Sequence, residues 1–133
     1  MIPNYLAAMP QFLTYVLMGG LLLWLFASLY TFLTPQDEMA LIREGNMAAC
    51  LLLIGALLGF LLPLAKAIAQ HSTLMATIQW ALLSALVQLG VYAALRLFWQ
   101  GLHAAVLAER SAVGLFAGFI SVSAGILNAA AMP

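Results

Sequence analysis

Long apolar segments alternate with short polar connectors along this chain of 133 residues. No Asp, Glu, Lys or Arg occurs in residues 1–36, 45–65, 67–95 or 111–133. Each of these runs reaches or exceeds the roughly 20 residues that a helix needs to cross a bilayer. The pattern predicts an all-α polytopic membrane protein, in which four transmembrane helices form a single transmembrane domain over residues 1–133.

Prolines and capping residues suggest where these helices begin and end. Pro10 suits the first turn of the first helix, and Thr34-Pro35 ends that helix and begins a short interfacial one. Pro63 predicts a kink or an early end of the second span, and Ser111 can cap the fourth. The expected spans are about 10–33, 46–65, 72–98 and 111–132, with the interfacial helix at about 35–45.

Composition agrees with a place in the lipid bilayer. The chain is 66% hydrophobic and 6% charged, with a mean hydropathy of +1.11, too apolar to cover a water-facing surface. Its zero net charge and lack of a basic cluster exclude a nucleic acid as partner. The N-terminus has no basic residue before its apolar stretch, so the first segment is read as a retained helix rather than a signal peptide.

Half of the charged residues lie in one stretch, TPQDEMALIREGN at residues 34–46. We expect an acid of this connector to pair with an arginine of the connector at 96–111, and Arg43 to pair with Glu109. The alternative is that these are solvated interface charges, each pair worth only about 0–1 kcal/mol. The candidate charges between the hairpins are Glu38, Arg43, Glu44, Arg96, Glu109 and Arg110.

The same charges set the expected orientation. The two connectors share one face and carry three arginines, whereas the opposite face has only Lys66. By the positive-inside rule, the connectors are predicted to be cytoplasmic and both termini periplasmic in a bacterial inner membrane.

Small and polar residues within the spans predict helix association. Gly55-x-x-x-Gly59 and Gly114-x-x-x-Gly118 permit close backbone approach, the main source of packing energy between helices in lipid. Polar groups inside a span mark either interhelical hydrogen bonds or a solute path. The packing candidates are Gly55, Gly59, Gly114, Gly118, Ser121 and Gly125, and the intramembrane polar candidates are Asn46, Gln88 and Asn128.

An internal echo suggests two duplicated hairpins. LIREGNMAA from Leu41 aligns with VLAERSAVG from Val106, 65 residues later. This alignment matches Glu44 to Glu109 and Asn46 to Ser111. Coincidence is an equal explanation for nine aligned residues.

Several of these motifs also resemble a known family. TP, LIREGNMAA, G-x-x-x-G and the terminal AGILNAAAM, with EGN at 44–46, look like the YjfL-like bacterial inner-membrane proteins, domain of unknown function 350. The resemblance implies a small four-span inner-membrane protein and supplies no catalytic residues. Members of the family resemble components of envelope-stress gene neighbourhoods, which implies a further envelope protein as a possible partner.

No enzymatic chemistry is evident in the sequence. His71 and His103 fall on opposite faces in the predicted topology, so they cannot share a metal, and no cofactor motif is present. Cys50 reads as a small buried hydrophobe. We therefore expect a protein, not an enzyme, that acts through helix association, as a homo-oligomer or as the membrane subunit of an envelope-stress assembly. The alternative is an oligomeric channel or transporter for a small solute or ion.

Overall fold

The computed structural model describes residues 2–70 and 73–133, with side chains from Asn4 onward, and every regular element in this part is a helix. Two short helices, α2 (Glu38–Arg43) and α5 (Leu102–Leu107), lie between longer ones. The longer helices are long and apolar enough to cross a membrane. They are α1 (Ile2–Leu33), α3 (Met47–Gln70), α4 (Leu74–Phe98) and α6 (Ser111–Ala131). This confirms the predicted all-α polytopic fold with four transmembrane helices.

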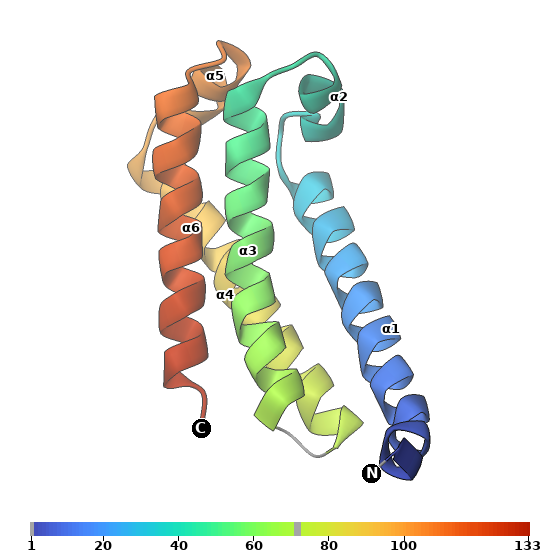
Figure 1. The fold of residues 1–133 in the computed structure, drawn as a ribbon. Helices are drawn as coiled ribbons and strands as arrows, with labels where there is room; N and C mark the ends of the chain where they lie inside the picture. Colours follow the sequence, from blue (N-terminus) through green and yellow to red (C-terminus); the bar gives the residue numbers. More distant parts are fainter. Residues whose placement is uncertain (1, 71–72) are drawn as a thin grey trace.

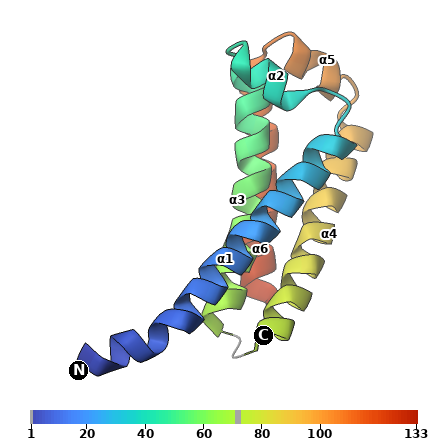
Figure 2. The ribbon, with the colours of Figure 1, turned by 90° about the vertical axis from the view of Figure 1, so that its right-hand side faces the viewer.

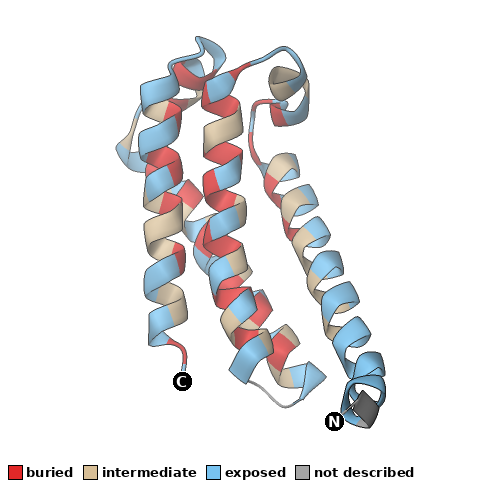
Figure 3. Ribbon diagram, viewed as in Figure 1, coloured by how far each residue is buried: buried red, intermediate tan, exposed pale blue. Residues whose placement is uncertain are grey.

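The helices surround α3, which packs against α1, α4 and, most extensively, α6 (Figure 1). Both short helices lie at one end of the bundle, and both chain termini lie at the other (Figure 1). The N-terminal half of α1 diverges from the other spans (Figure 2). Buried residues accordingly concentrate on α3, while that half of α1 is exposed (Figure 3).

Two prolines lie inside helices that were predicted to begin or end near them. α1 begins at Ile2 and includes Pro10, and α3 continues through Pro63 to Gln70. A proline removes one helical hydrogen bond but does not prevent the helix where neighbouring groups pack well. Pro63 is buried in the bundle beside Leu64, so tertiary packing carries α3 past the predicted end at 65.

The caps also differ from the predicted ones. Asp37, rather than Thr34, caps α2 by accepting a 3.2 Å hydrogen bond from the Ala40 amide, so α2 is shorter than the predicted 35–45 helix. Thr73 caps α4, while the predicted start at residue 72, and His71, lie outside the described residues. At α6 the capping position is Arg110 rather than Ser111, which is the first helical residue.

The order of long, short and long helix occurs twice, as a duplicated hairpin requires. Backbone geometry shows which residues of the two hairpins correspond. The residue just after each short helix that has a left-handed backbone is Gly45 (φ 87°) in the first hairpin and Glu109 (φ 59°) in the second. Gly45 donates its amide to Ile42, and Glu109 donates in the same way to Val106. The predicted alignment of Glu44 with Glu109 is therefore wrong by one residue, and Gly45 is the structural equivalent of Glu109. The helix α5 was missed, because LHAAVL was read as a connector.

Candidate functional site

A seam of small residues holds α3 and α6 together. A Cβ added at Gly55 would lie 2.3 Å from the Cα of Gly118, so the two backbones are in direct contact. Gly114 packs in the same way on Ala48, and Gly125 on Gly59. The predicted packing residues thus meet within one chain, where they join the two hairpins: Gly55, Gly59, Gly114, Gly118, Ser121 and Gly125.

The intramembrane polar candidates do not gather into one site. Gln88 in α4 donates from Nε2 to the Ser121 carbonyl at 3.0 Å, and the absence of a side chain at Gly59 makes room for this contact. Asn128 has a buried Nδ2 without a partner. Asn46 lies at the end of the bundle rather than within a span. Its Oδ1 accepts from the Ala49 amide at 3.0 Å and its Nδ2 donates to the Val106 carbonyl at 2.8 Å, so it caps α3 and ties it to α5.

Lys66 serves the opposite end of the bundle. Its Nζ donates to the carbonyl oxygens of Ala129 and Met132, the latter at 3.0 Å. These carbonyls lie at the C-terminal end of α6, where a cation is favoured by the helix dipole and by unpaired acceptors. Lys66 therefore joins the two hairpins at this end.

The predicted charges between the hairpins are not brought together in pairs. None of the hydrogen bonds or ion pairs found in residues 2–70 and 73–133 joins two of these side chains. Five of them are exposed: Arg43, Glu44, Arg96, Glu109 and Arg110. The exception is Glu38, which is fully buried, with 0% exposure.

Glu38 belongs to a polar cluster that links the hairpins through Gln36. The Gln36 Nε2 donates to Glu38 Oε1 at 3.1 Å, and its Oε1 lies 2.9 Å from His103 Nδ1 in α5. Since an amide oxygen can only accept, His103 Nδ1 carries the hydrogen in this contact. The amide of Gln36 thus connects the α1–α2 connector of the first hairpin to the short helix of the second.

Aromatic rings enclose this cluster on the membrane side. Tyr30 in α1 meets Tyr92 in α4 edge-on, with ring centroids 5.3 Å apart. One turn before Tyr30 in α1, the ring of Phe26 stacks on the ring of Phe60, with centroids 4.5 Å apart. The carboxyl of Glu38 therefore lies between apolar rings and polar connectors, out of contact with water.

Burial controls the ionisation of Glu38. It raises the pKa of this carboxyl from its usual 4.5 to about 7, and the polar side chains of Thr34 and Gln36 oppose the shift only in part. Glu38 Oε2 and the Tyr30 hydroxyl are both buried without a hydrogen-bond partner. A carboxyl in this setting can hold a proton at neutral pH.

The sequence contained no pattern that identified this cluster. Glu38 was predicted as an interfacial charge, and Gln36, Tyr30 and His103 were not included among the candidates. A glutamine two residues before a glutamate is common on any polar connector. The burial of both depends on how the connector and α2 pack against the rest of the bundle, α3 in particular, which no local motif specifies.

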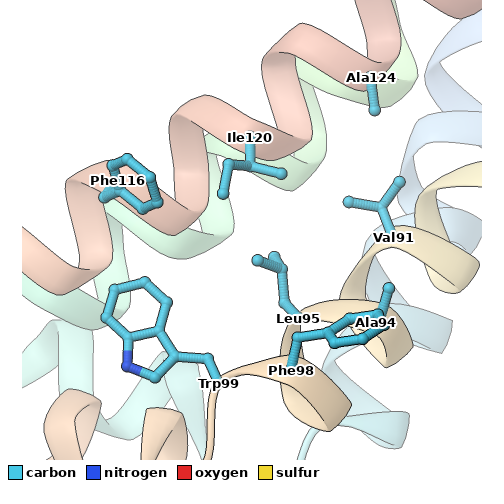
Figure 4. A pocket seen from close by; sticks show the side chains of 8 residues that line it. All are labelled: Val91, Ala94, Leu95, Phe98, Trp99, Phe116, Ile120 and Ala124. Atoms are coloured by element: carbon cyan, nitrogen blue, oxygen red, sulfur yellow. The ribbon is translucent and has the colours of Figure 1, made fainter.

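An apolar groove lies between α4 and α6 near the same end (Figure 4). It has a volume of about 490 Å³, and its wall includes Trp99 packed edge-on against Phe116 at 5.8 Å. The other lining residues are Val91, Ala94, Leu95, Phe98, Ile120 and Ala124. A groove whose one polar side-chain group is the indole N–H of Trp99 can hold a hydrocarbon chain but has little to orient a reacting substrate. No group of three His, Cys, Asp or Glu side chains in the described part of the chain could hold a metal ion.

The sequence matches one protein family and two inner membrane proteins. The profile of the family described as Domain of Unknown Function (DUF350) matches residues 4–132. The UPF0719 inner membrane protein YjfL of Escherichia coli K12 is 32% identical over 129 residues, which cover 97% of this chain and 98% of that protein. The protein of the same name from Escherichia coli O157:H7 matches equally. No solved structure matches the chain.

Proposed function

The chain belongs to the DUF350 family, and we propose that this multi-pass inner membrane protein acts through helix association, as a homo-oligomer whose contact helix is α1. The observation that carries the proposal is the uneven burial of the spans. In the most apolar 18-residue window of each span, 56% of the residues of α3 are buried but only 6% of those of α1.

The exposed part of α1 has features that suit a protein neighbour better than lipid alone. Its N-terminal half leaves a groove of about 490 Å³ against α3, lined on the α1 side by Gln11, Phe12 and Tyr15. Gln11 is exposed there. An amide in this position gains from a hydrogen-bonding partner, which lipid chains do not supply.

Gly20 provides a place of close approach in the middle of α1. A Cβ added at Gly20 would meet no atom of the described residues within 4 Å, so the position leaves room beside the α1 backbone. A second copy presents the same open glycine, and a two-fold contact brings the two together on one interface. These properties support a second copy of the chain as the occupant, rather than a different envelope protein.

The alternative of an oligomeric channel has less support. Gln88 donates from Nε2 to the Ser121 backbone carbonyl inside the bundle, and the glycine seam closes the space between α3 and α6. A solute path would have to run between copies, where the exposed polar groups of the spans include Gln11 and Thr14 of α1 and Gln79 of α4.

The test compares Gly20→Leu with Gly90→Leu in nanodiscs. Gly90 in α4 also has open space around an added Cβ, so both variants should fold. We expect wild-type protein and Gly90→Leu to show the same oligomer by light scattering and subunit photobleaching, and Gly20→Leu to show mainly monomer. A monomeric wild type, or equal loss in both variants, would overturn the proposal.

A further inference from the structure

Glu38 is fully buried but has no cationic partner among the described residues. Its Oε1 accepts one hydrogen bond from Gln36, and its Oε2 accepts none. An ionised carboxylate removed from water without compensating charge or hydrogen bonds is strongly disfavoured, and such groups take up a proton instead. The geometry around Glu38 is that of a neutral acid.

The ionisable groups facing Glu38 come from several helices. Tyr30 of α1 and Tyr92 of α4 lie within electrostatic reach of it, and Arg96 of α4 acts on Tyr92 from the exposed rim. His103 of α5 reaches it only through Gln36. On its own helix and cap, Arg43 and Asp37 are exposed. α3, which packs on α2, contributes Cys50 as its one titratable side chain near this end, since Lys66 bonds at the opposite end.

Two buried atoms of the cluster have no hydrogen-bond partner among the described residues, Glu38 Oε2 and the Tyr30 hydroxyl. The Tyr30 hydroxyl does not donate to the carboxyl in this arrangement, so Oε2 has no donor that would stabilise a negative charge. An ionised carboxylate would leave the negative charge facing the rings of Tyr30 and Tyr92.

We propose that Glu38, held by Gln36 where the two hairpins meet, is a proton-binding site, and that the packed arrangement of α2 on α3 is the proton-bound state. The raised pKa of Glu38 places uptake and release near neutral pH. Release of the proton leaves a charge that water must reach. The packing of α2 on α3 and the Gln36–His103 bridge then loosen. This site does not depend on whether α1 associates with a second copy.

The experiment is an infrared titration of the protein in nanodiscs from about pH 5 to about pH 9, which reads the carbonyl band of protonated carboxyl groups directly. We expect a band that persists to near neutral pH and is lost in Glu38→Gln. Glu44→Gln, which changes an exposed acid of the same connector, should leave that band unchanged.

Three results would overturn the proposal. The first is a wild-type spectrum in which no band depends on Glu38. The second is a Glu38 band that titrates together with the exposed acids. The third is loss of the band on adding sodium or potassium at constant pH, which would make the site a cation site. Because Glu38→Gln keeps the size and polarity of a protonated glutamate, it should fold, and circular dichroism at acid pH checks this.

Discussion

Gly55 and Gly118 lie backbone against backbone, on two helices that run in the same direction through the bundle (Figure 1). The contact determines how closely the hairpins approach, since α3 is the central helix and α6 its main neighbour. A side chain at either position has no space without separating the helices.

We expect Gly55→Ala to destabilise the monomer by about 1–3 kcal/mol or more, because the added Cβ would meet backbone atoms that cannot rotate away. Gly90→Ala is the matched control, since its Cβ meets open space. Thermal unfolding in detergent measures both. Equal melting temperatures for wild type and Gly55→Ala would mean that the seam is not packed as described.

Asn46 allows its two hydrogen bonds to be tested separately. Asn46→Ser keeps an oxygen that can cap α3 but is too short to reach the Val106 carbonyl, whereas Asn46→Ala loses both bonds. We expect Asn46→Ala to cost about 1 kcal/mol more than Asn46→Ser, the usual value of a helix cap. If the two variants unfold at the same temperature, the amide does not act as a cap.

Glu109 has a left-handed backbone that suits glycine, as its structural equivalent Gly45 shows. We expect Glu109→Gly to leave stability unchanged or to raise it by up to about 1 kcal/mol, because relief of strain offsets the entropy cost of glycine. Gly45→Ala should lower stability, although its added Cβ meets no atom. A clear loss of stability in Glu109→Gly would contradict this assignment.

Stability should depend on pH through Glu38. Its pKa is higher in the folded protein, about 7, than its usual 4.5, so the folded state keeps the proton over a range in which the unfolded state has lost it. Stability should therefore be highest below about pH 4.5 and fall by up to roughly 3 kcal/mol as the pH rises to about 7. Glu38→Gln should flatten this part of the profile. A wild-type profile that rises with pH over the same interval would show that Glu38 is stabilised in its ionised form.

Orientation in the membrane is open to direct measurement. The connectors share one end of the bundle and contain Arg43 and Arg110, which favours the cytoplasmic side for that end. We expect a periplasmic reporter inserted near Gly45 to be inactive and one fused after Pro133 to be active. The reverse pattern would place the Glu38 cluster on the periplasmic side.

Hydropathy was sufficient to predict the four spans, because the cost of polar groups in lipid acts on each segment separately. It could not predict that α3 continues past Pro63. A proline inside a helix is locally unfavourable, and here the burial of Leu64 in the bundle compensates for it. Nor could charge counting show that Glu38 is buried while Glu44 is exposed. The two acids belong to one connector, and only the packing of α2 against the bundle separates their environments.

The repeated hairpin places Glu38 and Leu102 at equivalent sites, as the first residues of α2 and α5, and both side chains are buried. The molecule thus contains its own comparison: the same backbone position accepts an aliphatic side chain in one half and an acid in the other. A short helix of this kind does not need a carboxyl group to close the end of the bundle. Glu38→Leu should therefore yield a protein that folds and has lost its response to pH, which makes the acid an addition to the architecture rather than a part of it.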